Sequence, residues 1–141
     1  MKLPLITIGL TTYNAEDTVE RAVNSALSQS YRPIEIVAVD DCSTDQTLEI
    51  LRLLSIKHPE LRIISNQFNG GVSKSRNHIL QNAKGEFVAF FDDDDESCPD
   101  RLEKQYLRIK EYEHQHANGA PVICHAAREL HYPDGSIRLE S

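Results

Sequence analysis

The sequence predicts an α/β protein with a mainly parallel sheet and helices on both of its faces. Short apolar runs alternate along the chain with longer segments that repeat apolar residues at helical spacing. Such alternation is typical of parallel strands joined by right-handed helical crossovers. A chain of 141 residues most often forms one domain, so we expect a single domain over residues 1–141.

The predicted strands are short runs rich in apolar and β-branched residues, bounded by polar or turn-forming residues. They lie at residues 5–10, 34–39, 61–65, 86–91 and 122–124, and two more short strands flank a turn at residues 132–135. The apolar run at residues 87–91 has the length of a buried strand rather than that of a helix.

The predicted helices begin at polar residues or proline and end near proline or glycine. The first begins at Asn14 or Ala15 and ends before Pro33, the second is capped by Ser43 or Thr44, the third covers residues 72–83 after a turn at 69–71, and the fourth runs from Pro99 to Asn118. These helices, placed between the strands, complete the alternating order.

Polar segments follow three of the predicted strands. They are residues 11–14, 40–45 and 92–95. Because the carboxyl ends of parallel strands share one edge of the sheet, where ligands bind in open α/β sheets, we expect the three segments to form one site.

The third of these segments consists of four consecutive aspartates, residues 92–95. Two unit charges about 4 Å apart repel by about 4 kcal/mol at an effective dielectric constant of about 20. A divalent cation such as Mg²⁺ or Mn²⁺ would relieve this repulsion and could also hold substrate phosphates. The alternative is a solvated acidic loop, as most charged runs are.

The other two segments and the start of the third helix offer further contacts. Tyr13 presents an aromatic face for stacking, and Asp41 could accept a hydrogen bond from a ring N–H, although an acid there could instead cap the next helix. Residues 70–73 would offer free backbone N–H groups to an anion. Arg76 could reach a phosphate or an acid, or could be a solvated helix residue.

The bulk composition excludes some classes of protein. The net charge is −7 and no basic stripe is present, so we expect no nucleic-acid partner. The cysteines Cys42, Cys98 and Cys124 form no Cys-x-x-Cys pair, which favours reduced thiols in a cytoplasmic protein. No apolar stretch approaches the ~20 residues of a membrane span.

Four segments carry a family resemblance, and they occur in order: residues 12–14, 39–45, 69–77 and 92–95. From about Leu5 to Arg108 the chain resembles a family 2 glycosyltransferase of GT-A (Rossmann-like) fold. The resemblance implies transfer of a sugar from a nucleotide diphosphate donor to an acceptor hydroxyl, usually with inversion and with Mn²⁺ or Mg²⁺. A UDP-sugar is the expected donor, and the acceptor is a saccharide, a lipid-linked molecule or a protein.

The same resemblance assigns roles to individual residues. Thr11 and Tyr13 would line the base pocket, Asp41 would bind the ring N–H of the base, and Arg76 would lie near the base and the phosphates.

In the acid run, the first and third residues match the family's Asp-x-Asp motif. Asp92 would face the ribose and Asp94 would contact the metal ion that bridges the phosphates. Asp93 fills the variable middle position and is counted with the nucleotide-binding residues.

The chain departs from the family pattern at two positions and in its C-terminal part. Cys42 replaces a common glycine, which costs little if the backbone there is not at positive φ, and Ser75 replaces a common alanine. The family's acceptor site and general base follow the Asp-x-Asp motif, so we expect the C-terminal part to be truncated and the base to lie beyond residue 141. The alternative function is then nucleotide binding without turnover. We also expect peripheral approach to a membrane through the acceptor, and self-association through exposed apolar surface.

Overall fold

The computed structural model describes residues 2–140, and the backbone alone of Ala117. The chain divides into two compact units, Met1–Pro99 and Asp100–Ser141, which we describe separately. Whether residues 1–141 behave as one domain in solution stays a prediction. Among the described residues, no helix has both the length and the hydropathy needed to cross a membrane.

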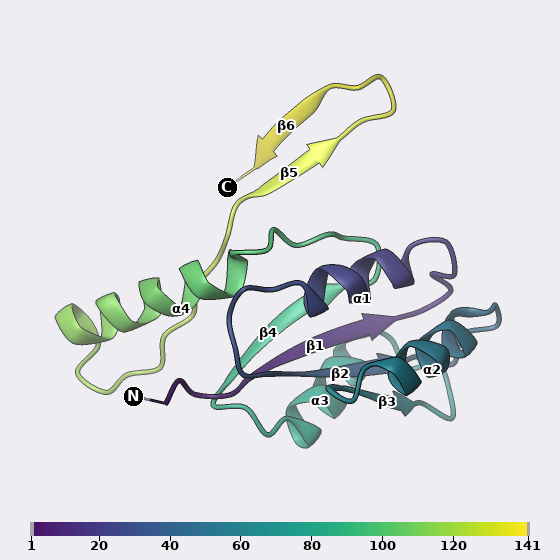
Figure 1. Cartoon of the computed structure of the whole chain (residues 1–141), viewed down its shortest axis with the longest axis horizontal. Helices are drawn as coiled ribbons and strands as arrows, with labels where there is room; N and C mark the ends of the chain where they lie inside the picture. Colours follow the sequence, from purple (N-terminus) through teal and green to yellow (C-terminus); the bar gives the residue numbers. More distant parts are fainter. Residues whose placement is uncertain (1, 141) are drawn as a thin grey trace. The chain divides into compact units, whose positions relative to one another are not determined.

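The first unit alternates strands and helices around a four-stranded sheet (Figure 1). Its elements are β1 (Ile6–Thr12), α1 (Val19–Leu27), β2 (Ile34–Asp40), α2 (Thr47–Lys57), β3 (Leu61–Ser65), α3 (Val72–Asn82) and β4 (Phe87–Asp92). The strand order is β3-β2-β1-β4, and every neighbouring pair is parallel. The predicted α/β class and mainly parallel sheet are therefore confirmed.

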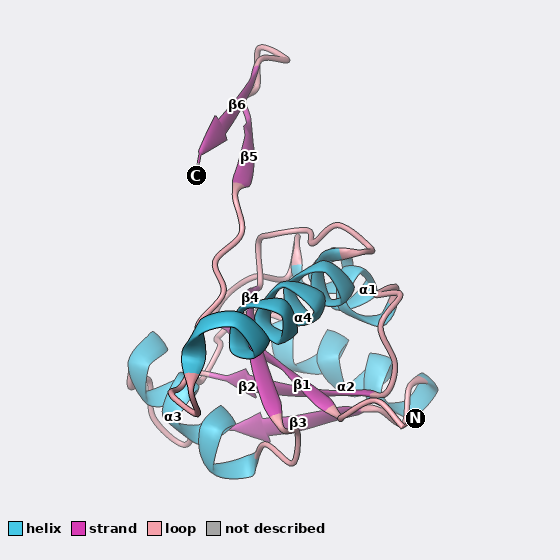
Figure 2. Cartoon of the chain, turned by 90° about the vertical axis from the view of Figure 1, so that its left-hand side faces the viewer, coloured by secondary structure: helices cyan, strands magenta, loops and turns pink. Residues whose placement is uncertain are grey.

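Helices cover both faces of this sheet, as the sequence predicts (Figure 2). Helix α3 contacts β1 and β2 on one face, and α1 and α2 pack together on the other. All seven residues of β2 are buried, because this central strand is covered on both sides.

The core under α3 depends on close contact between the helix and the sheet. Ile79 of α3 is fully buried together with Val37 and Val39 of β2. A Cβ atom added at Gly9 of β1 would lie 2.5 Å from Cγ2 of Ile79, so only glycine allows this approach. The tight packing fixes the first turn of α3 near the carboxyl ends of β1 and β2.

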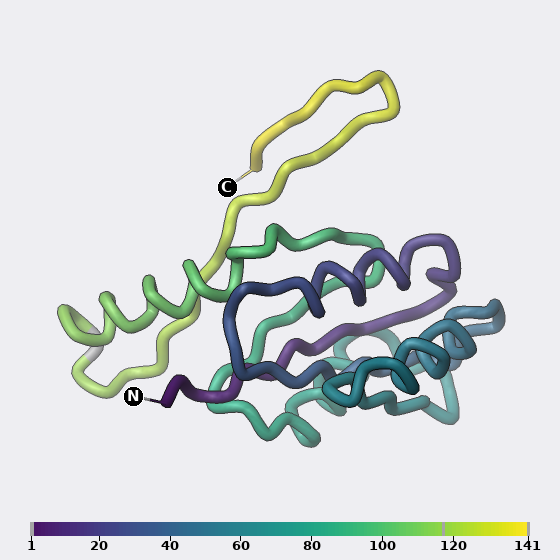
Figure 3. Tube along the Cα trace, viewed as in Figure 1, coloured from purple at the N-terminus to yellow at the C-terminus, as the bar shows by residue number. Residues whose placement is uncertain are grey.

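The second unit contains a helix and a hairpin. Its elements are α4 (Arg101–Tyr112), a π-helical turn (Glu113–Ala117), β5 (Arg128–His131) and β6 (Ile137–Glu140). The tube in Figure 3 follows the chain from α4 into the hairpin. The strands pair antiparallel, and the predicted turn is closed by a 2.9 Å hydrogen bond from Tyr132 N to Ser136 O.

Three helices begin later than the sequence predicts. Helix α1 begins at Val19. Asn14 has a φ of 45°, which a right-handed helix does not allow, and the N–H groups of Asn14 and Ala15 donate to the side chains of Ser43 and Thr47. Helix α2 begins at Thr47, and α4 begins at Arg101 rather than at Pro99.

The strand predicted at residues 122–124 is wrong, since these residues form no strand. The carbonyl of Cys124 accepts a hydrogen bond from Gln105 Nε2 of α4 at 3.4 Å. A short apolar run forms a strand only when another strand pairs with it, and the neighbour of this run is a helix.

Candidate functional site

The register of the sheet brings the predicted segments to one edge. Thr11, near the carboxyl end of β1, pairs with Val39 of β2 on one side and with Asp92 of β4 on the other. The next residue, Thr12, pairs with Asp40. Segments that lie about eighty residues apart in sequence thus meet at a single edge, as the sequence predicts.

Asp40 and Asp41 have different surroundings. Asp40 is fully buried, and it accepts hydrogen bonds from Thr12 Oγ1 at 3.1 Å, Ser43 N at 3.0 Å and Ser43 Oγ at 2.6 Å. Asp40 therefore orders the loop between β2 and α2, but it does not cap α2, which begins at Thr47 with no side-chain hydrogen bond at its N-cap residue Gln46.

Asp41 instead holds the glycine turn before α3. Its Oδ1 accepts from Asn66 Nδ2 at 2.8 Å and from Gly70 N at 2.9 Å, and its Oδ2 accepts from Gly71 N at 2.8 Å. Burial alone would raise the pKa of Asp41, but these hydrogen bonds and the charge of Lys74 hold the pKa below its usual value. The carboxylate is ionised at neutral pH and acts only as an acceptor.

This arrangement corrects the expectation of free N–H groups at residues 70–73. The N–H groups of Gly70 and Gly71 both point at Asp41, so neither can bind an anion at the same time. A carboxylate has about four acceptor positions, of which three are filled here. No described residue donates to the fourth position, on Oδ2, and Asp41 as a whole is 5% exposed.

The acid run contacts the loop after β1. Oδ2 of Asp93 accepts a hydrogen bond from Tyr13 N at 2.8 Å, while the Tyr13 side chain is 49% exposed and presents its ring to solvent. Burial raises the pKa of Asp93, and the neighbouring charges of Asp94 and Asp92 raise it further, against the opposing effect of the Tyr13 N–H.

Arg76 joins α3 to the acid run. Its guanidinium lies 3.6 Å from Oδ1 of Asp92 and 5.2 Å from the centroid of the Phe90 ring. Both partners of the ion pair are half exposed, so the pair adds little to stability and leaves both groups accessible.

The acids of this edge suit a metal ion only in combination with a ligand. Over residues 2–140, no three His, Cys, Asp or Glu side chains are grouped to hold an ion. Asp93 and Asp92 are engaged by Tyr13 and Arg76, and Asp94 is exposed. Mg²⁺ and related ions commonly take one or two carboxylates together with substrate phosphates, and this donor set meets that requirement.

Sequence reasoning missed three residues beside Asp41. They are Asn66, Ser75 and His78, which the structure joins by hydrogen bonds. Asn66 directly follows β3, so the rule on strand ends could have found it. Nothing in the local sequence indicates the other two.

The structure also gives the backbone φ of Cys42, on which the effect of replacing glycine depends. Its φ is 63°, in the left-handed region that favours glycine. The condition under which Cys42 would cost little is therefore not met, and the backbone at this position is strained for a residue with a Cβ atom. The thiol lies 3.8 Å from the carbonyl oxygen of Gln67, in the loop before α3.

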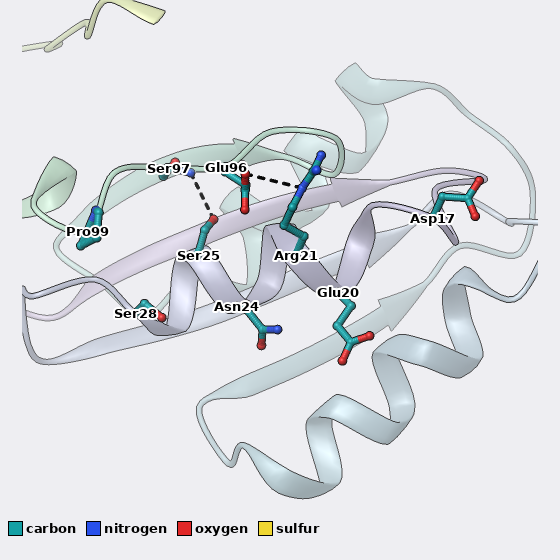
Figure 4. Close-up of a pocket in the computed structure, with 9 residues that line it drawn as sticks. All are labelled: Asp17, Glu20, Arg21, Asn24, Ser25, Ser28, Glu96, Ser97 and Pro99. Atoms are coloured by element: carbon teal, nitrogen blue, oxygen red, sulfur yellow. Dashed lines mark hydrogen bonds and ion pairs between the residues drawn. The ribbon is translucent and has the colours of Figure 1, made fainter. Parts of the chain in front are cut away.

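The segment after the acid run lies along α1, where a shallow polar hollow opens (Figure 4). Ser97 N donates to Ser25 Oγ at 3.2 Å, and Arg21 Nε lies 3.7 Å from Glu96 Oε2. None of the site residues predicted from the sequence lines this hollow.

Comparison with known proteins identifies the family. The sequence profile of Glycosyl transferase family 2 matches residues 7–134. The "Putative teichuronic acid biosynthesis glycosyltransferase TuaG" of Bacillus subtilis is 35% identical over 142 aligned positions, which cover 93% of this chain and 56% of the relative. The chain therefore belongs to glycosyltransferase family 2. It spans about half the length of the first curated relatives it matches, from 42% to 56%.

Solved structures agree on the GT-A fold. A Staphylococcus aureus TarS structure, residues 1–349 in complex with UDP-GlcNAc, matches with a TM-score of 0.70 and 37% identity, over 77% of this chain and 32% of that chain. The Pyrobaculum calidifontis mannosyltransferase PcManGT, in complex with GDP-Man and Mn²⁺, matches with a TM-score of 0.69 and 29% identity. The match covers 73% of this chain and 31% of that chain. The roles of the individual site residues in this chain stay predictions.

Proposed function

We infer that this chain forms the donor-binding part of a glycosyltransferase that uses a nucleotide diphosphate sugar. The observation that carries the proposal is the meeting of the loops after β1, β2 and β4 at one sheet edge. There Tyr13 N donates to Asp93, and Thr11 lies in register with Asp92. TarS, a relative of the same fold, has been solved with UDP-GlcNAc and with UDP, which supports a nucleotide-sugar ligand at this edge.

UDP is the nucleotide that we expect the site to prefer. Tyr13 and Thr11 would line the base pocket, and the open acceptor position of Asp41 would take the ring N–H of uracil. Cytosine lacks that N–H, so a pocket built around this acceptor should reject CDP. Guanine offers a ring N–H too, and PcManGT binds GDP-Man, so GDP is the main competitor.

Asp94 is the residue that would contact Mn²⁺ or Mg²⁺, while Asp92 would face the ribose. A bound ion would offset the charge of the leaving nucleotide diphosphate. Arg76 is placed to contribute a fixed positive charge to the phosphates, since its guanidinium already lies 3.6 Å from Asp92.

In the proposed reaction an acceptor hydroxyl attacks the anomeric carbon. A bond forms between that carbon and the hydroxyl oxygen, the bond from the carbon to the phosphate oxygen breaks, and a base takes the hydroxyl proton. Attack from the face opposite the leaving group inverts the anomeric centre. We assign the base to no residue, and the cytoplasmic location and the acceptor class stay predictions.

Isothermal titration calorimetry with UDP, GDP and CDP, each with and without Mn²⁺, tests the proposal. We expect UDP to bind most tightly, and Mn²⁺ to strengthen its binding. Tighter binding of CDP than of UDP would contradict the assignment of Asp41. The alternative function, nucleotide binding without turnover, is separated by measuring sugar transfer to saccharide and lipid-linked acceptors.

A further inference from the structure

A side-chain network links α3 to Asp41. Asn66 Nδ2 donates both to Asp41 Oδ1 at 2.8 Å and to Ser75 Oγ at 3.2 Å, and Asn66 Oδ1 lies 2.7 Å from His78 Nδ1. Asn66 is 6% exposed and Ser75 is fully buried, so solvent cannot replace these contacts.

The direction of every hydrogen bond in the network follows from the Asp41 carboxylate. Asp41 only accepts, so the Asn66 amide must turn its nitrogen toward it and its oxygen toward His78. His78 Nδ1 must then carry a proton. If His78 did not donate, Asn66 Oδ1 would be left buried without that donor, and Asp41 and Ser75 alone would hold the amide.

The network sets the orientation of Asp41 at the glycine turn. Asn66 and Gly70 on Oδ1 and Gly71 on Oδ2 fix the plane of the carboxylate, and with it the direction of the one acceptor position that no described residue fills. Ser75 and His78 both lie on α3, which the packing of Ile79 on Gly9 holds against the sheet. The position of α3 therefore determines, through Asn66, where the Asp41 carboxylate lies.

We propose that His78, Asn66 and Ser75 are positioning residues that orient Asp41 and so determine which nucleobase the site accepts. The inference deepens the proposed function and depends on it, since Asp41 itself would contact the base. The Ser75 hydroxyl holds Asn66 from α3, at 3.2 Å from Asn66 Nδ2. Loss of these hydrogen bonds would let the Asp41 carboxylate turn. The site would then discriminate less well between a base with a ring N–H and a base with an unprotonated ring nitrogen.

The test compares the dissociation constants of UDP and CDP for wild-type and variant proteins by calorimetry. His78→Phe keeps the ring volume and removes the donor, and we expect the preference for UDP over CDP to fall about fivefold or more. His78→Asn places an amide nitrogen near the position of Nδ1 and should restore the preference to within about threefold of wild type. Ser75→Ala should reduce the preference by a smaller factor.

Thr7→Val is the matched control, because Thr7 is also fully buried and donates a 2.6 Å hydrogen bond to Glu35. Its pairing partners Glu35 and Val88 lie four or more positions before the carboxyl ends of β2 and β4. We expect Thr7→Val to lower the melting temperature without changing the UDP/CDP ratio. If His78→Phe behaves in the same way, the network is merely structural and the inference is overturned.

A further comparison separates the inference from the function on which it rests. If wild-type protein does not prefer UDP, or if Asp41→Ala leaves the preference unchanged, the assignment of Asp41 is wrong and the inference falls with it. If Asp41→Ala removes the preference but His78→Phe and Ser75→Ala both retain it, only the positioning role is overturned.

Discussion

The backbone N–H of Tyr13 donates a 2.8 Å hydrogen bond to the carboxylate of Asp93, which joins the loop after β1 to the acid run after β4. Asp93 receives this donor while Asp92 and Asp94 repel its charge. The contact therefore holds the two loops together, although it keeps the Asp93 charge close to two other acids, which is electrostatically unfavourable.

Asp93→Asn should raise the melting temperature at pH 7. The amide oxygen can still accept from Tyr13 N, whereas the unfavourable burial of the charge and, after it, the repulsion from Asp94 and Asp92 disappear. Because the pKa of Asp93 is raised in the folded protein, its ionised form disfavours folding above that pKa, and the penalty vanishes as the pH falls through it. Thermal unfolding of both proteins from pH 7 to pH 3 should show a gain that shrinks toward acid pH. A gain of equal size at every pH would contradict this explanation.

Asp94→Asn should remove the effect of Mn²⁺ on UDP binding and leave the fold intact. Asp94 is exposed, and among the three acids at residues 92–94 it is the one without an Arg76 or Tyr13 contact. Calorimetry with UDP, with and without Mn²⁺, measures the difference. Glu20→Gln is the matched control, because it removes the same charge from an exposed position on α1. An unchanged response to Mn²⁺ in Asp94→Asn would exclude Asp94 as the metal ligand.

The four strands of the sheet and the start of α3 could be predicted from the sequence, but the starts of α1, α2 and α4 could not. An apolar β-branched run such as the one in β2 predicts a strand from the local sequence alone. The strand is covered on both faces, so nearly all of its residues are apolar and the pattern is clear. The start of α1 depends instead on Ser43 and Thr47, which lie 29 and 32 residues from the backbone groups that they bind. Local propensity contains no information about such distant partners.

The meeting of the three loops at one edge could also be predicted, because the carboxyl ends of parallel strands share one edge of the sheet. The internal hydrogen bonding of the site could not. The partners of Asp41 include Asn66 and Gly70, which lie 25 and 29 residues away in sequence. Local sequence patterns cannot identify partners at such separations. For the same reason the expectation of free N–H groups at the glycine turn was wrong.

Cys42→Gly should stabilise the protein by about 0.5–1 kcal/mol. A left-handed backbone costs a non-glycine residue about 1–2 kcal/mol, and the added flexibility of glycine in the unfolded chain offsets about 0.5–1 kcal/mol of that gain. Urea unfolding should show a higher midpoint with an unchanged slope. Cys42→Ala is the control, since it removes the thiol, keeps the Cβ and should give no such gain. Equal midpoints for the two variants would show that the φ of 63° carries no strain.

Glu35→Gln should destabilise the protein at neutral pH and much less at acid pH. Burial would raise the pKa of Glu35, but hydrogen bonds from Thr7 Oγ1, Lys84 N and Arg62, together with the Arg62 charge, hold it below its usual value of 4.5. A carboxyl with a lowered pKa contributes stability that is present above its unfolded value and is lost as the pH falls through the folded value. Glutamine keeps one acceptor oxygen, which can serve Thr7 and Lys84 or Arg62 but not both, so its N–H₂ group faces at least one donor. A buried donor left without an acceptor costs about 1–3 kcal/mol.

Urea unfolding of wild-type and Glu35→Gln proteins between pH 7 and pH 3 measures this effect. We expect a difference in unfolding free energy of about 1–3 kcal/mol above pH 5, declining as the pH falls below about 4.5. Glu86→Gln makes the same chemical change at an exposed residue just before β4 and should leave the stability unchanged at every pH. A difference for Glu35→Gln that does not depend on pH would mean that packing, rather than the carboxylate charge, gives Glu35 its role at this end of the sheet.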